Sequence, residues 1–291
     1  MNLSLPSRRK LRSYYLEFYY NVLGAAQSTM GVDPLGHETP VTISLTSIYP
    51  RLRLTHLTLE TLLRQTVRPT RIVLWIPTDG RGAPPVGYEA SLTPQLQRLR
   101  HRGLDIRWTR DFGPHTKLLP SASTFPDSIV VTADDDVFYP SNWLERLLDG
   151  HRKYPGHIVC YRGLKMTRNE EGLAPYNDWP EYSSTEPGPE LFPLGRDGVL
   201  YPPGCFTPEV FNEEVFRRTT PLNDDTWFKA MSLHAGTNCY KLDPNHRAFL
   251  DNYRSYEVDS LMSRNVAGGK NDPQLKETFE HYDLLKALPR S

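Results

Sequence analysis

Three consecutive carboxylates, Asp134, Asp135 and Asp136, follow directly after the apolar, β-branched run at 128–133. A short run of this kind predicts a buried strand, because a central parallel strand needs apolar cover on both faces. In an open α/β sheet, ligands bind at the carboxyl ends of such strands. Adjacent negative charges need a compensating cation, and hard oxygen ligands suit Mg²⁺ or Mn²⁺. We therefore expect a divalent cation with a phosphorylated substrate; the alternative is a solvated turn that caps the next helix through Asp136 or Ser141.

A second acidic pair, Asp224 and Asp225, lies roughly 90 residues further along, where the sequence predicts the start of a helix. An acid at a helix start can serve simply as a cap, which is the alternative here. Two adjacent acids exceed what a cap requires, and one of them can act as a general base if it faces a substrate hydroxyl. A metal-binding cluster with a separate base suits metal-dependent transfer from a nucleotide sugar, because the cation neutralises the departing diphosphate.

Composition limits the classes of function. The chain has 291 residues, with 34 Lys and Arg balanced by 34 Asp and Glu, so no net charge favours nucleic acid as a partner. The cysteines Cys160, Cys205 and Cys239 show no C-x-x-C spacing, and a reducing cytoplasm is the simplest compartment. Neither a signal-peptide pattern nor an apolar run of roughly 18 residues is found. We expect a cytoplasmic protein, soluble or peripheral on the inner face of the membrane.

The elements that must position the acids alternate between strand and helix from residue 41 onward. Because no G-x-G-x-x-G or Walker sequence is present, metal and side chains would have to meet a diphosphate. The alternation implies an α/β fold with an open, mostly parallel, Rossmann-like sheet and helices on both faces. Residues 169–203, rich in proline, glycine and aromatics, predict an irregular substrate-binding excursion. Apolar runs predict strands at 41–46, 71–76, 104–108, 128–133 and 158–161, and periodic patterns predict helices at 52–66, 93–102 and 141–154.

An amino-terminal extension precedes this pattern. Residues 8–27 carry apolar and aromatic side chains at helical spacing after a basic start, and a turn-rich linker follows at 31–40. The basic head and aromatic face could rest on an anionic membrane surface, join two subunits in a homodimer, or pack on the protein's own domain.

Four segments in order resemble bacterial GT-A glycosyltransferases, family-2-like enzymes that transfer sugars to polysaccharide or lipooligosaccharide. The acidic triplet looks like their D-x-D metal motif, and residues 43–51 with 62–66 resemble their first β-α unit. Residues 198–203 and 224–227 are similar to later segments of these enzymes. The Q-x-x-R-W segment of many family-2 members is absent, which argues against a processive membrane synthase.

The resemblance implies roles for the acids. Asp225 matches the carboxylate that serves as base in inverting members, and Asp224 lies beside it. Asp136 would ligate the metal, Asp134 would lie by the ribose or uracil, and Asp135 could do either through water.

Further residues are implied to meet the nucleotide or the metal. Arg51 and Lys117 are the basic candidates, with an exposed surface charge as the alternative for each. A late histidine often completes the metal site in this class, and His246, in an expected loop, is favoured over His234 and His281. The nucleotide-binding candidates fall at three places. Thr46, Ser47 and Arg51 follow the first strand, Asp79 follows the second, and Lys117 precedes the triplet.

Taken as a whole, the resemblance implies an inverting enzyme that uses Mn²⁺ or Mg²⁺ to move a hexose, galactose or glucose, from a UDP-sugar to a hydroxyl of a bacterial surface glycan such as lipopolysaccharide or capsule. A glycan or lipid-linked glycan would be the acceptor. Residues 1–40 would form the extension and 41–291 the catalytic domain, divided at about 160 into nucleotide-binding and acceptor-binding halves. The alternatives are a nucleotidyltransferase of similar fold, which would need a glycine-rich basic loop after the first strand, and a non-catalytic sugar-binding subunit.

Overall fold

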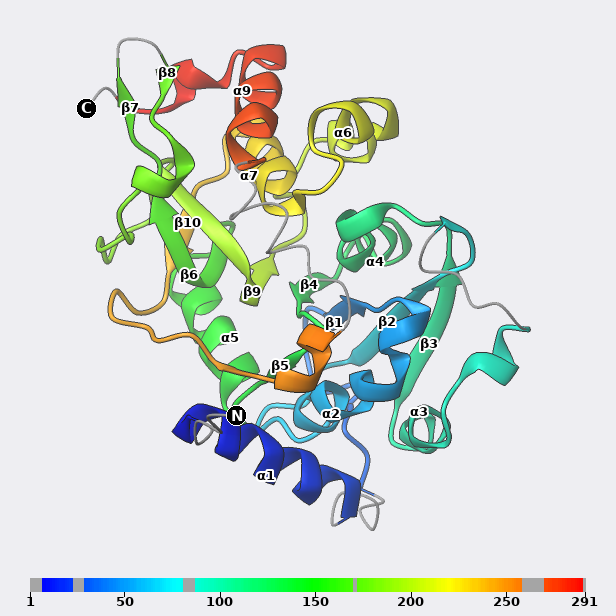
Figure 1. Ribbon diagram of the computed structural model, residues 1–291. Helices are drawn as coiled ribbons and strands as arrows, with labels where there is room; N and C mark the ends of the chain where they lie inside the picture. Colours follow the sequence, from blue (N-terminus) through cyan, green and yellow to red (C-terminus); the bar gives the residue numbers. More distant parts are fainter. Residues whose placement is uncertain (1–6, 23–28, 81–86, 170–171, 258–269, 290–291) are drawn as a thin grey trace, which may run out of the picture.

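The computed structural model describes residues 7–22, 29–80, 87–169, 172–257 and 270–289. Its centre is a seven-stranded sheet in the order β10-β6-β9-β4-β1-β2-β3 (Figure 1). Neighbouring strands pair in parallel except β9, which is antiparallel to β4 and to β6. The open, mostly parallel α/β sheet expected from the sequence is therefore confirmed. The strands are β1 (Val41–Thr46), β2 (Arg71–Pro77), β3 (Leu104–Thr109), β4 (Ile129–Thr132), β6 (Ile158–Lys165), β9 (Leu191–Tyr201) and β10 (Cys239–Lys241).

Helices cover both faces of the sheet, as expected. Val131 and Leu200 pack into the apolar cluster on one face, whereas Val130 and Val199 pack into the cluster on the other. Central strands thus need apolar side chains at every position, which is why they read as continuous apolar runs. The first face is covered by α2 (Leu52–Leu62), α3 (Pro94–Arg100) and α5 (Trp143–Lys153), and the second by α4 (Leu119–Thr124), α6 (Glu213–Thr219), α7 (Asp224–His234) and α9 (Asn271–His281).

Short elements complete the chain. Two small antiparallel pairs join β5 (Val137–Phe138) to β11 (Leu250–Asp251) and β7 (Arg168–Asn169) to β8 (Gly172–Leu173). The 3₁₀ turns are η2 (Tyr49–Arg51), η4 (Glu89–Ser91), η5 (Gly113–Lys117), η6 (Tyr176–Asp178), η7 (Pro208–Phe211), η8 (Tyr253–Glu257) and η9 (Leu284–Ala287).

The expectation for residues 169–203 is wrong over its second half, where β9 forms a central strand. Pro193 and two glycines interrupt the strand pattern, so the sequence reads as loop. Gly198 has φ +106°, and a Cβ there would lie 2.5 Å from the indole Nε1 of Trp143, so a helix packs directly on the strand backbone. Gly198, which makes the strand hard to predict from the sequence, is thus the place where Trp143 packs closely on the strand.

The amino-terminal helix is present as α1 (Arg8–Val22), and it packs on the rest of the protein. Glu17 forms an ion pair with Arg254 at 3.1 Å, and Arg9 donates a hydrogen bond to the Phe249 carbonyl at 2.6 Å. The end of the expected helix, 23–27, lies outside the described residues. Within the described part of the chain, no helix is both long and apolar enough to cross a membrane.

Candidate functional site

The acidic triplet lies at the carboxyl end of β4, as expected, with one residue between it and Thr132, and protein cations lie against it. Arg51 Nη2 lies 2.9 Å from Asp135 Oδ1 and 2.6 Å from Asp136 Oδ2. Ser47 donates a hydrogen bond to Asp135 Oδ2. Because β1 and β4 are parallel neighbours, the loop after β1 meets the loop after β4 at one edge of the sheet. The sheet topology therefore brings together Ser47, Arg51 and the triplet.

Lys117 joins the triplet to the second acidic pair. Its Nζ lies 3.1 Å from Asp134 Oδ1 and 2.9 Å from Asp224 Oδ2. The side chain comes from η5 and is only 10% exposed, and that of Arg51 is 18% exposed. Both are therefore components of the carboxylate cluster, and the alternative of exposed surface charges is wrong.

Neither acidic group caps a helix. At the start of α7 the side chain of Asn223 accepts the hydrogen bond from Thr226 N at 3.0 Å, which is the capping contact. Helix α5 begins after Asn142 without a side-chain cap, so the triplet does not fulfil that role either. Asp225 instead accepts hydrogen bonds from the backbone N–H of Gly195, with both carboxylate oxygens 3.1 Å from the nitrogen.

Burial and like charge set the ionisation of the cluster. Burial, then the charge of Asp224, raises the pKa of Asp225 to about 7, against the opposing effect of Lys117. Burial and the charge of Asp135 likewise raise the pKa of Asp136 to about 6. Burial would raise the pKa of Asp134 as well, but the Lys117 ammonium holds it below its usual value. Two carboxylates of the cluster, Asp225 and Asp136, thus have proton affinities raised toward neutral pH, and that of Asp225 is the higher.

Asp225 and Lys117 both lie close to Gly195, which has no side chain to displace them. A Cβ at this position would lie 2.6 Å from Asp225 Oδ1 and 2.7 Å from Lys117 Nζ. If Asp225 is the general base that the sequence resemblance implies, Gly195→Ala should lower turnover by about 10²-fold, because displacement of such a group by about 1 Å has that effect. Steady-state kinetics with thermal melting checks this, with Gly87→Ala, where a Cβ meets nothing within 4 Å and the backbone is not left-handed, as the control for added bulk at a glycine. Unchanged turnover in Gly195→Ala would mean that the Asp225 position is not critical.

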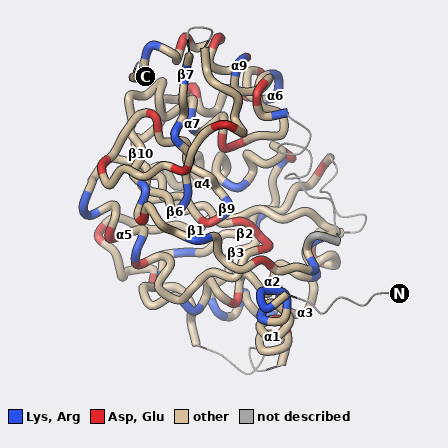
Figure 2. The backbone as a smooth tube through the Cα atoms, turned by 60° about the vertical axis from the view of Figure 1, so that its left-hand side comes forward, with Lys and Arg blue, Asp and Glu red and all other residues tan. Residues whose placement is uncertain are grey.

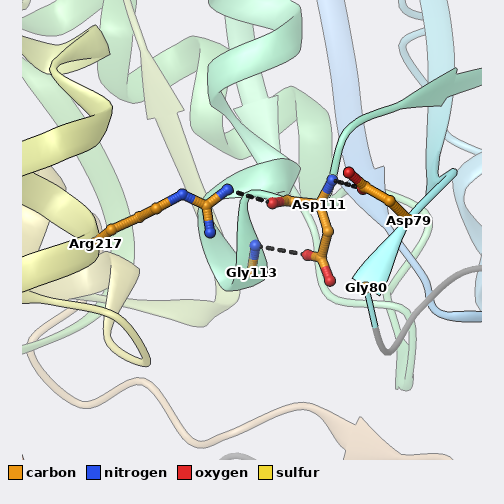
Figure 3. A pocket seen from close by; sticks show the side chains of 5 residues that line it. All are labelled: Asp79, Gly80, Asp111, Gly113 and Arg217. Carbon is orange, nitrogen blue, oxygen red and sulfur yellow. Dashed lines mark hydrogen bonds between the residues drawn. The ribbon is translucent and has the colours of Figure 1, made fainter.

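Asp79 lies in a separate pocket of about 290 Å³ at the same edge of the sheet, past the ends of β2 and β3 (Figure 3). Its Oδ1 accepts a hydrogen bond from Asp111 N at 2.6 Å, and Asp111 Oδ1 accepts one from Gly113 N at 2.7 Å. Arg217, from α6, donates to the Asp111 carbonyl at 2.6 Å. The pocket therefore has acid on one side and a guanidinium on the other, and Asp111 and Arg217 were not anticipated from the sequence.

Two other candidates are occupied by contacts within the protein. Thr46 donates its hydroxyl hydrogen to the Trp75 carbonyl at 3.0 Å, which ties β1 to β2. His246 has its Nε2 2.9 Å from Asp197 Oδ2 and packs edge-on against Phe249, 4.7 Å between ring centroids. These contacts give His246 a structural partner and do not place it with the triplet, so its role as a metal ligand stays a prediction.

A tyrosine and the middle of β9 support the site and were missed by sequence reasoning. Asp134 N donates to the Tyr139 hydroxyl at 2.9 Å, and that hydroxyl donates to the Arg196 carbonyl at 2.8 Å. The pair of charged residues Arg196 and Asp197 within an otherwise apolar strand was the available signal. Tyr139 thereby fixes the triplet relative to Gly195, next to Arg196, and so relative to Asp225.

One aromatic side chain near Asp225 keeps part of its surface accessible. Trp179 and Trp227, like Tyr182, are buried in the core and do not offer a face to a ligand. Tyr176 is partly exposed, and the Asp225 charge contributes, after burial, to raising its pKa. Among these four side chains, Tyr176 alone is partly exposed next to Asp225, in a position where an aromatic ring can stack on the face of a sugar.

The charges at the cluster suit a divalent cation that is held partly by its substrate. The raised pKa values of Asp135, Asp136, Asp224 and Asp225 reflect burial of carboxylates whose charge Arg51 and Lys117 compensate incompletely. Mg²⁺ and Mn²⁺ commonly take one or two carboxylates and complete their coordination with water and phosphate oxygens. Among the described residues, no group of three or more His, Cys, Asp or Glu side chains is arranged to hold a metal. Asp136 fits as one carboxylate ligand of such a cation, whose other ligands would come from outside the described side chains.

Comparison with known proteins gives distant structural matches. No family model matches the chain, and no curated protein matches it. The mannosyltransferase PcManGT from Pyrobaculum calidifontis, solved with GDP-Man and Mn²⁺, is 13% identical, with 97% of this chain and 82% of that chain covered and a TM-score of 0.45. S. aureus TarS 1-349 is 12% identical over 85% of this chain and 70% of that chain, with a TM-score of 0.44. GalNAc-T7 with UDP, GalNAc and Mn²⁺ is 13% identical over 91% and 63%, with a TM-score of 0.44.

Proposed function

We propose that this chain is an inverting, metal-dependent glycosyltransferase that moves a hexose, galactose or glucose, from a UDP-sugar to a hydroxyl of a bacterial surface glycan. The observation that carries this proposal is the meeting of the two acidic groups at Lys117, which contacts Asp134 and Asp224. Asp225, the neighbour of Asp224 in the chain, is a buried carboxylate whose pKa is raised to about 7. The donor class, the acceptor and the inversion come from the sequence resemblance.

The chain's own residues supply the base and the fixed charges of the reaction. Asp225 takes the proton from the acceptor hydroxyl as its oxygen attacks the anomeric carbon, and the bond from that carbon to the phosphate oxygen breaks as the nucleoside diphosphate departs. Gly195 N–H orients the Asp225 carboxylate. A divalent cation at Asp136 would supply positive charge to the departing diphosphate. Arg51 and Lys117 hold the acids of the triplet in place.

The pocket at Asp79 offers a position for the nucleoside. It lies beyond β2 and β3, on the edge of the sheet that also carries the triplet, so a nucleotide there could extend its phosphates toward Asp136. Carboxylates accept hydrogen bonds from base and ribose donors, and Asp79 and Asp111 provide two. Ser47 and Arg51 lie between the Asp79 pocket and the acidic triplet. They follow β1, and β1 stands between β4 and β2 in the sheet.

A panel of nucleotide sugars tests the proposal. We expect Mn²⁺-dependent release of UDP from one UDP-hexose, abolished by EDTA and restored by added Mn²⁺, with mass spectrometry as the readout. Asp136→Asn should weaken the Mn²⁺ dependence, and Asp149→Asn, an exposed acid on α5, is the matched control. Pyrophosphate release from a nucleoside triphosphate would indicate a nucleotidyltransferase instead. Sugar binding without any turnover would indicate a non-catalytic subunit.

A further inference from the structure

The helix α1 exposes the side that is richer in apolar and aromatic residues. Leu11, Tyr15, Phe18 and Val22 are 53%, 63%, 63% and 52% exposed. Their spacing of four, three and four residues places them in one stripe along the helix, and Tyr14, 38% exposed, adjoins it. A surface helix ordinarily turns its apolar stripe to the core, so this arrangement is the reverse of the usual one.

The opposite side of α1 explains why the helix still packs on the protein. Ser13 is buried there, and Glu17 is paired with Arg254. Tyr20 stacks on Phe138 with 6.1 Å between ring centroids, and Asn21 lies 3.0 Å from His56 Nε2. Polar and aromatic contacts thus hold the helix, and its outward stripe, defined as Leu11, Tyr14, Tyr15, Phe18 and Val22, is left for another partner.

Positive charge borders the outward stripe. Arg8, Lys10 and Arg12 are exposed, and the side-chain ammonium of Lys10 lies 5.9 Å from the centroid of the Tyr14 ring. Figure 2 shows the basic residues gathered on α1, at the lower end of the molecule in that view. The acidic residue of the helix, Glu17, belongs to the inward side. An aromatic stripe with basic margins is the arrangement by which helices lie in the headgroup region of a bilayer with acidic lipids.

A second copy of the chain is a poorer fit to this face. A two-fold dimer brings the same patch of both subunits into one interface, where two sets of basic margins would have no acidic side chain of α1 to offset them, because Glu17 lies on the inward side. The five side chains of the stripe are also few beside the roughly 20–30 residues that each partner contributes to a standard interface. Acidic lipid headgroups complement the basic margins without that repulsion.

We propose that the outward stripe of α1 and its basic margins form a docking surface for an anionic lipid bilayer. The surface is independent of the chemistry at the carboxylate cluster. Hydrogen bonds nevertheless link helix α1 to the strand beside the carboxylate cluster. Arg9 and Arg196 both donate to the Phe249 carbonyl, and Arg196 adjoins Gly195. A docked molecule would therefore hold its carboxylate cluster at a fixed position relative to the membrane.

Vesicle sedimentation of the full chain tests this surface. We expect the protein to bind vesicles of phosphatidylcholine with phosphatidylglycerol, and to bind vesicles of phosphatidylcholine alone far more weakly, with binding reduced by high salt. The variant Arg8→Gln/Lys10→Gln/Arg12→Gln should lose on the order of 10²-fold in affinity, since each basic residue near such a surface contributes about fivefold. Tyr15→Ser/Phe18→Ser should lose at least about tenfold through the apolar area that no longer enters the interface.

Phe211→Ser, which removes a phenylalanine 44% exposed on η7, is the matched control and should bind as the parent does. Thermal melting of each variant should match that of the parent, because the replaced side chains are exposed. Equal binding to both kinds of vesicle, or binding that the α1 variants leave unchanged, would overturn the proposal. So would a dimer in light scattering that the Tyr15→Ser/Phe18→Ser variant dissociates, because it would assign the stripe to a second copy.

Discussion

Asp225→Asn is expected to slow the proposed sugar transfer by about 10²–10⁴-fold, which is the usual contribution of a positioned general base. An acceptor alcohol is a poor nucleophile at neutral pH, and the amide cannot take its proton. The side chain keeps its shape, and its carbonyl oxygen can still accept the hydrogen bond from Gly195 N. We therefore expect UDP and Mn²⁺ to bind as in the parent while turnover falls, measured by calorimetry and by UDP release with an acceptor.

The dependence on pH gives the same prediction a second readout. With the pKa of Asp225 raised to about 7 by burial and by Asp224, its basic form is lost as the pH falls below that value. The parent's kcat/KM should therefore rise with pH up to about 7 and level off above it, while the residual rate of Asp225→Asn should lack this step. Near-normal turnover in the variant, or a product with retained anomeric configuration by NMR, would contradict the assignment.

The free energy of unfolding of Asp225→Asn shows whether this variant is folded. A carboxyl group whose pKa is higher in the folded state than in the unfolded chain favours folding below the unfolded value, and that contribution is lost as the pH rises through the folded value. For Asp225 the loss falls between the ordinary aspartate pKa of about 3.9 and about 7. The asparagine variant should thus be at least as stable as the parent at pH 8, so that lost turnover cannot be due to unfolding. Asp149→Asn should leave both turnover and stability as in the parent.

The sheet was predictable because each central strand meets apolar cover on both faces. The runs that form β1, β2, β3 and β4 are continuous for that reason, and their expected bounds lie within one or two residues of the observed ones. The strand β9 was not predictable, because it contains Pro193, Gly195 and Gly198. Proline and glycine disfavour strands, and here tertiary packing overrides that local preference. Gly195 and Gly198 are needed for close contact with Asp225 and Trp143, which no local pattern reveals.

The site shows the same division between local and tertiary information. Acids at a strand end and at a helix start are visible as local patterns, and the structure brings both groups together. The partners of these acids depend on which strands are neighbours. Arg51 meets Asp136 because β1 pairs with β4, and Lys117 reaches both acidic groups from η5. The resemblance singles out both cations as donor-binding candidates, but their pairing with the acids could not be predicted, since it arises only when the sheet is assembled.

Lys117→Met is expected to destabilise the folded protein by roughly 3–5 kcal/mol at pH 8, the usual cost of leaving buried charges without their partner. Lys117 lies against Asp134 and Asp224, and its charge also lowers the pKa of Asp225. Methionine preserves the length and apolar stem of the side chain, so the variant removes charge and leaves little cavity. Urea unfolding measures the difference in the free energy of unfolding, and Lys153→Met, at an exposed lysine of α5, is the matched control.

The sign of the pH effect distinguishes lost charge from lost packing. In the parent, Lys117 holds the pKa of Asp134 below its usual value against the effect of burial. Without the ammonium, burial raises the pKa of Asp134 in the folded state above that of the unfolded chain, and folding is then penalised increasingly as the pH rises through that range. The deficit of Lys117→Met should accordingly be largest at pH 8 and shrink toward pH 4, where the buried carboxyls take up protons. A deficit that stays constant with pH, or one below about 1 kcal/mol, the range of an exposed ion pair, would show that Lys117 does not serve as the shared counter-charge of the two acidic groups.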